Sequence, residues 1–294
     1  MYAVIGANGY LGSYVIKAVQ ELTEEKIVAT ARDMSRVKPD ERVEWFFCDV
    51  QSDESADALI GRLSREKNVK IVYLAAYHNP DNVAQNPEIA WDINVTCLSK
   101  FLNKARFAQK IYYASTDSVY GESEHRYHFK EGDPLKPVNI YGRQKCAAEA
   151  LMIQMGRNVV RFPFLISPSL VYKPHFYDVI ADSLKAGKPF EMFKDSYRSS
   201  LSFENAGKLL VRLMEKENIP SVINICGDKD LSKYDVGLLI ADREGVNRDL
   251  IVPISIGQPQ ENFVTKRATS TLMDNSLLKS LLGLKEIDIF KEAV

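Results

Sequence analysis

A glycine-rich segment near the start of the chain constrains the fold more than any other feature. The apolar run Tyr2–Ile5 leads directly into Gly6-Ala7-Asn8-Gly9-Tyr10-Leu11-Gly12, and an amphipathic stretch follows. Strand, glycine turn and helix in this order are typical of a dinucleotide site. Gly6 permits the tight turn, Gly9 lets the backbone approach a pyrophosphate, and Gly12 lets the helix pack on the strand. The segment therefore predicts a bound dinucleotide cofactor.

Apolar runs and helical patterns alternate through the first half of the chain. The runs that predict strands are Ile27–Ala31, Val43–Cys48, Val69–Leu74, Ile111–Ala114 and Asn158–Phe162. The stretches that predict helices are Asp53–Leu63, Pro87–Ala108 and one that begins near Tyr141. Because strands and helices alternate, we expect an α/β fold with a doubly wound parallel sheet, the Rossmann architecture.

The alternation weakens after about Ser167, where Pro168, Pro174 and Pro189 interrupt the pattern. We therefore expect a dinucleotide-binding domain over residues 1–166, with a returning segment near 199–226. Residues 167–294 are expected to form mostly a smaller C-terminal substrate-binding lobe. The leucines between Thr269 and Leu282 predict a closing helix whose apolar face belongs to the core.

Composition limits the classes of ligand. Lys and Arg total 38 and Asp and Glu total 39, so the net charge is −1, and no basic block favours nucleic acid or an anionic membrane as partner. No stretch approaches the ~18 apolar residues of a membrane span. The 4 cysteines are widely separated, so we expect reduced thiols and no metal site. These features predict a cytoplasmic enzyme that acts on small molecules.

Two residues one helical turn apart have the chemistry of a catalytic pair. Tyr141 and Lys145 are i and i+4, so on a helix they share a face. A free phenol titrates near pH ~10, and an ammonium beside it would lower its pKa toward neutrality. The hydroxyl of Thr116 would bind the same substrate carbonyl. The alternative interpretation is a surface helix that carries an ordinary tyrosine and lysine.

The expected strand Val69–Leu74 ends in Ala75-Ala76, small residues that let a cofactor approach Leu74 and its neighbours. His78 follows in a loop at the carboxyl edge of the sheet, where ligands of such folds bind. It either contacts substrate or is simply solvated.

Three segments together carry a family resemblance: Ser115-Thr116-Asp117-Ser118-Val119-Tyr120-Gly121, Glu131-Gly132-Asp133-Pro134 and Pro137-Val138-Asn139-Ile140-Tyr141-Gly142-Arg143-Gln144-Lys145. The chain resembles the extended short-chain dehydrogenase/reductases, and it is most similar to dTDP-4-dehydrorhamnose reductases and their nucleotide-sugar relatives. The resemblance implies that Thr116, Tyr141 and Lys145 are catalytic. It also implies a homodimer.

The resemblance further implies which residues contact the cofactor. The glycine segment, including Asn8, Tyr10 and Leu11, would bind the pyrophosphate. Asp49 and Val50 would lie beside the adenine, and Tyr141, Lys145 and Phe162 beside the nicotinamide and its ribose. At the end of the second strand Ala31 stands where NAD-preferring enzymes place a carboxylate, and Arg32 follows. This favours NADP, although Asp33 keeps NAD as an alternative.

The resemblance assigns substrate contacts to Thr116, Asp117, Phe164 and Arg198, with His78 beside them. Many relatives have a polar residue where Phe164 stands. The segment led by Arg198 is similar to that of nucleotide-sugar epimerases, in which the arginine contacts the nucleotide diphosphate, a role that suits a guanidinium. Asn94 matches an asparagine with a structural role.

Three functions remain open at this point. The first is NAD(P)H-dependent reduction of a keto group on a nucleotide-linked sugar. The second is epimerisation or dehydration of such a sugar, although dehydratases of the family carry Asp-Glu where this chain has Asp117-Ser118. The third is a non-catalytic regulatory subunit, because proteins that resemble the reductases also serve in that role.

Overall fold

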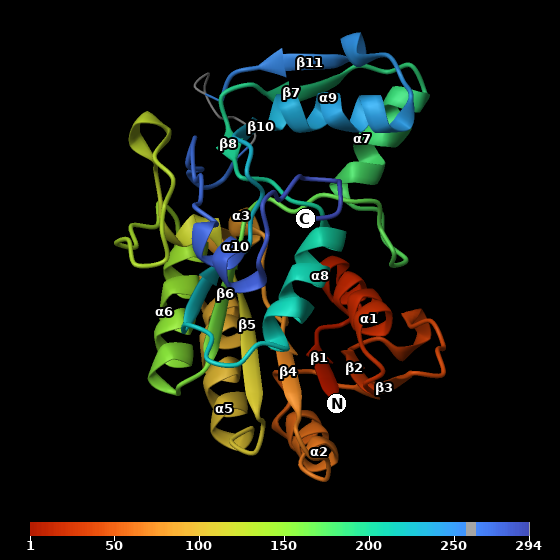
Figure 1. The fold of residues 1–294 in the computed structure, drawn as a ribbon, viewed down its shortest axis with the longest axis vertical. Coiled ribbons are helices and arrows are strands. Elements are labelled where there is room, and N and C mark those ends of the chain that lie inside the picture. The colour runs from red at the N-terminus through yellow and green to blue at the C-terminus, as the bar shows by residue number, and fades with distance from the viewer. Residues whose placement is uncertain (257–262, 294) are drawn as a thin grey trace.

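The computed structural model describes residues 1–256 and 263–293 and contains a large parallel sheet with a smaller lobe above it (Figure 1). Within these residues, 7 strands form the sheet in the order β3-β2-β1-β4-β5-β6-β9, and every neighbouring pair is parallel. The strands are β1 (Tyr2–Ile5), β2 (Ile27–Ala31), β3 (Val43–Phe47), β4 (Lys70–Tyr73), β5 (Lys110–Thr116), β6 (Asn158–Phe162) and β9 (Val222–Asn224). The strand order reverses between β1 and β4, which is where such folds bind ligands. The prediction of a doubly wound Rossmann sheet is confirmed.

Helices cover both faces of the sheet. One face packs on α1 (Tyr10–Leu22), α8 (Phe203–Met214) and α10 (Ser276–Leu282). The other packs on α2 (Asp53–Leu63), α5 (Cys97–Lys104) and α6 (Ile140–Gln154). The central strands β1 and β4 are buried along their whole length, as continuous apolar runs between two helical layers require.

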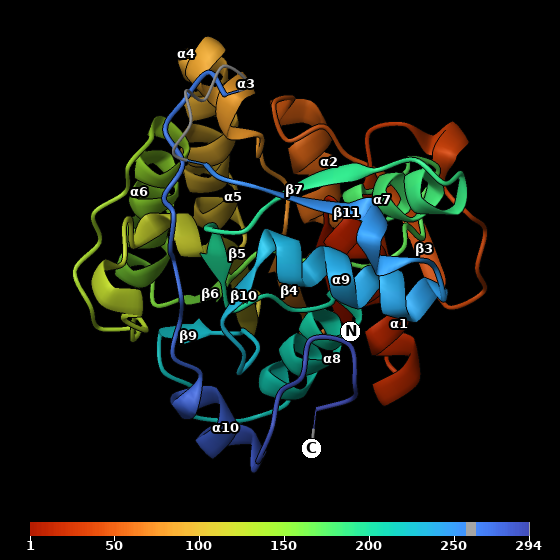
Figure 2. The same cartoon turned by 90° about the horizontal axis from the view of Figure 1, so that it is seen from above.

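The lobe has its own apolar core and lies over the carboxyl edge of the sheet (Figure 2). It contains α7 (Phe176–Lys185), β7 (Phe190–Phe193), β8 (Tyr197–Arg198), β10 (Leu231–Ser232), α9 (Lys233–Glu244) and β11 (Ile251–Ile254). Between these segments the chain returns to the sheet through α8 and β9. The domain boundary after residue 166 stays a prediction.

Two predicted helices differ from the structure. The expected helix Pro87–Ala108 is divided into α4 (Pro87–Trp91), a π-helical turn (Asp92–Thr96) and α5, which ends at Lys104. A short helix, α3 (Pro80–Gln85), precedes it.

The closing helix begins at Ser276, not at Thr269, because residues before it bond to other segments, and Ser270 and Met273 form β-bridges with Tyr197 and Phe129. The Glu122 carboxylate accepts hydrogen bonds from the backbone of Thr269 and Ser270, and Asp117 accepts one from the Thr271 hydroxyl. These contacts with distant segments prevent the local pattern from forming a helix.

Candidate active site

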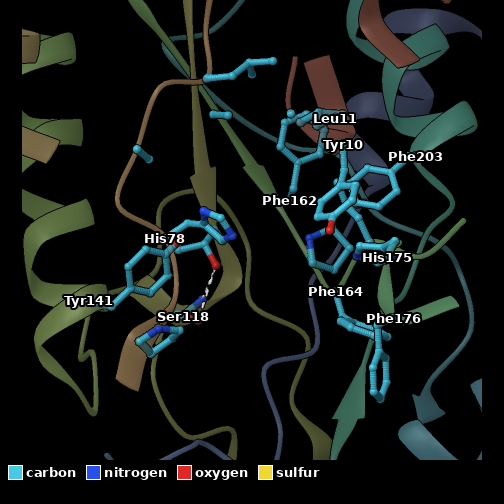
Figure 3. A pocket seen from close by; sticks show the side chains of 18 of the residues that line it. Tyr10, Leu11, His78, Ser118, Tyr141, Phe162, Phe164, His175, Phe176 and Phe203 are labelled. Atoms are coloured by element: carbon cyan, nitrogen blue, oxygen red, sulfur yellow. Dashed lines mark hydrogen bonds between the residues drawn. The ribbon is translucent and has the colours of Figure 1, made fainter. Parts of the chain in front are cut away.

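A cavity of about 1180 Å³ lies between the carboxyl edge of the sheet and the lobe. Figure 3 shows Tyr141, His78 and Ser118 on one side of it and Phe164, His175 and Phe176 on the other. Most residues predicted from the sequence as site residues line this cavity. They are Gly6, Asn8, Gly9, Tyr10, Leu11, Gly12, Arg32, Asp49, Leu74, Ala76, His78, Thr116, Asp117, Tyr141, Lys145, Phe162, Phe164 and Arg198.

Two other predicted cofactor contacts, Val50 and Ala75, are not among the residues that line the cavity. Val50 packs against the apolar cluster on the α2 side of the sheet. Ala75 lies behind the glycine turn, with its backbone nitrogen 3.0 Å from where a Cβ on Gly6 would stand. Ala75 therefore supports the turn from behind.

The glycine segment has the close contacts that its sequence requires. Gly6 has a φ of +83°, which favours glycine, and a Cβ on Gly12 would lie 2.6 Å from the carbonyl oxygen of Ala7. Gly9 begins α1, and no side chain of the described residues caps this helix. The backbone N–H groups of its first turn are thus available to an anion, and the helix dipole favours negative charge there.

Two arginines after β2 line the cavity wall. Arg32 directly follows the strand, and Arg36 ends the short 3-10 helix Met34–Arg36. Asp33, between them, accepts hydrogen bonds from the backbone and hydroxyl of Ser35, and it pairs with Arg36 at 2.8 Å. The Ser35 hydrogen bonds and Arg36 hold the pKa of Asp33 below its usual value. Arg36 also lies over the ring of Tyr172, which extends from the loop before α7. Sequence reasoning missed Arg36, because only the short 3-10 helix after β2 brings its side chain to Asp33 and to the cavity.

The proposed catalytic groups come from two elements. Thr116 ends β5, and Tyr141 and Lys145 lie on α6, whose first turn is capped by the Asn139 side chain. The Thr116 side chain lies beside the Tyr141 phenol and favours its ionised form. The amine of Lys145 donates to the Tyr113 hydroxyl at 2.9 Å and to the Ala114 carbonyl at 2.8 Å.

The electrostatics of the pair differ from the sequence-based expectation. Burial, together with the charge of Asp117, raises the pKa of Tyr141, and the Thr116 side chain opposes this only in part. The pKa of Lys145 is lowered by burial to about 7, although Glu149 favours the charged form. The prediction that Lys145 brings the pKa of Tyr141 toward neutrality is wrong, because desolvation affects both groups more strongly than their mutual interaction.

Buried polar side chains hold α6 and the loop after β4 in place. Asn94 accepts a hydrogen bond from the backbone N–H of Tyr77, donates to the Tyr77 carbonyl, and donates to Gln144 on α6 at 2.9 Å. The π-helical turn therefore positions Asn94 as a bridge between the two segments. One turn after Lys145 on α6, Glu149 pairs with Arg161 at 2.6 Å.

Arg198 and Asp117 form an ion pair at 3.2 Å inside the cavity. The guanidinium of Arg198 also donates to the backbone carbonyls of Tyr197, Ala268 and Thr269. Arg198 thus fastens the chain at Ala268 and Thr269 to the lobe, and its donors are largely occupied.

A further arginine at the cavity, Arg267, was also missed by sequence reasoning. It pairs with Asp81 at 2.9 Å through one nitrogen, but its buried Nη1 has no hydrogen-bond partner among the described residues. A buried guanidinium nitrogen without an acceptor is costly, so it marks a position for an anionic ligand. No local sequence pattern identifies Arg267, because its partner Asp81 lies far from it in the sequence.

Two histidines line the cavity from opposite sides (Figure 3). Burial and the neighbouring Lys145 lower the pKa of His78. Burial lowers the pKa of His175 to about 4, against the effect of Asp178. Both imidazoles are therefore mainly neutral at pH 7 and contribute no fixed charge.

The described residues contain no group of at least 3 His, Cys, Asp or Glu side chains arranged to hold a metal ion. None of the helices in this part of the chain has the length and apolar character needed to cross a bilayer.

Comparison with known proteins places the geometry in a family. The chain is 24% identical over 301 residues to methionine adenosyltransferase 2 subunit beta of Danio rerio, covering 99% of this chain and 88% of the relative. It is 27% identical over 264 residues to the probable low-salt glycan biosynthesis reductase Agl14 of Haloferax volcanii, and the match covers 85% of this chain and 83% of the relative.

Among solved structures, dTDP-4-dehydrorhamnose reductase of Bacillus anthracis, in complex with NADP, has the same fold. The TM-score is 0.77 at 18% identity, and the match covers 98% of this chain and 94% of that one. The model of the RmlD substrate binding domain matches residues 2–294, so the chain belongs to the RmlD substrate binding domain family.

Proposed function

We propose that the protein reduces a keto group on a nucleotide-linked sugar with NADPH. One observation carries the proposal: the Thr116 hydroxyl, the Tyr141 phenol and the Lys145 amine line the same cavity as the open N-terminus of α1. This arrangement combines a dinucleotide site with a proton donor and a hydroxyl that can orient a carbonyl.

The residues present fit an NADP cofactor, which supplies a hydride when bound. The first turn of α1 would hold the pyrophosphate. Glycine is required at position 12 of this turn, because a side chain there would collide with the backbone of Ala7. Arg32 and Arg36 would bind a 2′-phosphate, while Asp33 is engaged by Ser35 and Arg36. NAD remains the alternative cofactor. The complex of the similar Bacillus anthracis reductase with NADP supports the choice.

The raised pKa of Tyr141 suits reduction. At neutral pH the phenol keeps its proton, and this is the form that donates to a carbonyl oxygen as it becomes a hydroxyl. The Thr116 hydroxyl, which lies beside the phenol, would hold the same oxygen. Lys145, fixed by Tyr113 and Ala114, would bind the nicotinamide ribose. Ser118, in place of a glutamate, cannot act as the additional acid-base group of a dehydratase.

The nucleotide diphosphate would bind at the two arginines on the lobe side. Arg267 offers its unpartnered Nη1, and Arg198 contributes charge while it holds the segment beside Arg267. This assignment modifies the expectation from the sequence, in which Arg198 alone made the contact. A homodimer, implied by the family resemblance, stays a prediction.

Turnover of a set of UDP- and dTDP-linked keto sugars, neutral and acidic, followed as loss of NADPH absorbance, tests the proposal. Tyr141→Phe should lower the rate by roughly 10²–10⁴-fold, because it removes the proton donor and little packing. NADPH affinity should change little. Tyr234→Phe removes a phenol that packs in the lobe core, and it should leave the rate unchanged. A Tyr141→Phe variant with the wild-type rate would contradict the catalytic assignment.

The second candidate function is a regulatory subunit. It is favoured by the similarity over 99% of the chain to a protein named as a subunit of methionine adenosyltransferase. Absence of turnover on UDP- and dTDP-linked keto sugars, combined with co-purification with a methionine adenosyltransferase catalytic subunit, would favour it over the reductase.

A further inference from the structure

Lys233 is a cavity-lining cation that the proposed reaction does not use. It begins α9, directly after the capping residue Ser232, and its backbone N–H donates to the Ser196 carbonyl at 3.1 Å. The side chain enters the cavity, where its ammonium lies over the ring of Phe164. In the described part of the chain, the ammonium has no hydrogen-bond or ion-pair partner.

The charges around Lys233 leave its ammonium uncompensated. Arg198 disfavours the charged form and Asp117 favours it. The Asp117 carboxylate is already paired with Arg198 and accepts the Thr271 hydroxyl. Burial and Arg198 therefore hold the pKa of Lys233 well below its usual value. An anion bound beside Lys233 would restore its charged form and form a charge-assisted hydrogen bond.

The position of Lys233 relates it to the reacting end of the cavity. Asp117 interacts electrostatically with Lys233 on one side and with Tyr141 on the other, and the Thr116 hydroxyl donates to Asp117 at 3.0 Å. Phe164, under the ammonium, follows Phe162 by two residues at the end of β6. Lys233 thus approaches, from the lobe, the space in which Thr116 and Tyr141 would hold a sugar ring.

We propose that Lys233 binds a carboxylate on the sugar, so that the substrate is a nucleotide-linked acidic sugar such as a uronate. This inference rests on the proposed function. A neutral sugar hydroxyl would give Lys233 no counter-charge of its own, because Asp117 is already paired with Arg198. A carboxylate provides that counter-charge. The diphosphate has its own candidate partner in Arg267, whose Nη1 is free of hydrogen bonds to described residues.

Calorimetric titration with matched pairs of sugar nucleotides tests the inference. UDP-glucuronate and UDP-glucose differ by one carboxylate, as do the corresponding dTDP sugars. With NADPH present, we expect wild type to bind the acidic member roughly tenfold to a hundredfold more tightly. Lys233→Met should remove this preference and leave the affinity for the neutral sugar unchanged, while Lys233→Arg should retain the preference.

Lys229→Met is the matched control, because Lys229 is exposed and pairs with Asp288 outside the cavity. Unchanged NADPH affinity shows that each variant is folded. Equal wild-type affinity for acidic and neutral sugars would overturn the inference while the proposed function stands. A Lys233→Met variant that weakens both sugars equally would also overturn it, because Lys233 would then act on the diphosphate. If no sugar nucleotide binds, both proposals fail.

Discussion

Replacement of Lys145 by methionine should make the protein more stable at low pH and less stable at high pH. The Lys145 side chain is 3% exposed, and burial lowers its pKa from 10.5 to about 7. Methionine has a similar length and carries no charge. The variant therefore removes the cost of burying an ammonium, and it also removes the hydrogen bonds to Tyr113 and Ala114.

The sign of the pH dependence follows from the pKa of Lys145 in the folded and the unfolded state. Between pH 7 and 10.5 the unfolded chain holds a charged Lys145 while the folded chain favours the neutral amine. Stability from this group therefore falls as pH decreases, by about 1.4 kcal/mol per pH unit, and levels off below pH 7. The total cost at low pH is about 5 kcal/mol. Two lost hydrogen bonds cost about 1 kcal/mol each.

The variant should thus exceed wild type by about 3 kcal/mol at about pH 6 and be less stable than wild type at about pH 10. Urea unfolding across this range measures the difference. Other groups titrate in both proteins, so their contributions largely cancel. Lys100→Met removes an exposed lysine paired with Asp53, and its stability relative to wild type should show no such fall as the pH rises over the same range. A difference between Lys145→Met and wild type that does not change with pH would refute the argument, because Lys145 would then be equally protonated in both states.

Two further predictions concern the arginines. Arg32→Ala should weaken NADPH binding roughly tenfold to a hundredfold and leave NADH binding unchanged, measured by fluorescence titration; unchanged NADPH affinity would assign the 2′-phosphate to Arg36. Arg267→Met should weaken binding of a nucleoside diphosphate by a similar factor without loss of stability. Arg198→Met should weaken the same binding and also lower the melting temperature, because it removes the hydrogen bonds to the carbonyls of Ala268 and Thr269. Equal effects of the two variants on both measurements would show that they do not divide these roles.

The parts of the fold that the sequence predicted are those that depend on near neighbours in the chain. The boundaries of β1, β2, α2 and β6 match the expected runs, since buried strands and amphipathic helices have short periods. The glycine segment was equally readable, because Gly6 and Gly12 meet constraints imposed by residues a few positions away or by the adjacent strand.

The parts that the sequence did not predict depend on contacts between distant segments. The π-helical turn at Asp92–Thr96 fits local helix signals but brings Asn94 to Tyr77 and Gln144. The leucine pattern after Thr269 indicated a helix, yet the residues before Ser276 bond to side chains of other segments. Local periodicity carries no information about such partners.

Site electrostatics were the least predictable feature, and the reason is physical. Helical spacing placed Tyr141 and Lys145 on one face. This implied that the positive charge of Lys145 would determine the pKa of the Tyr141 phenol. Burial changes that order: desolvation lowers the pKa of Lys145 to about 7, so its charge is only partial at neutral pH, and desolvation together with Asp117 raises the pKa of Tyr141. A residue pair is visible in a sequence, but the dielectric environment around it is a property of the whole fold. The same argument applies to Lys233. In the sequence it is an ordinary lysine at the start of a helix, and only the folded chain places its ammonium over Phe164 and near Arg198.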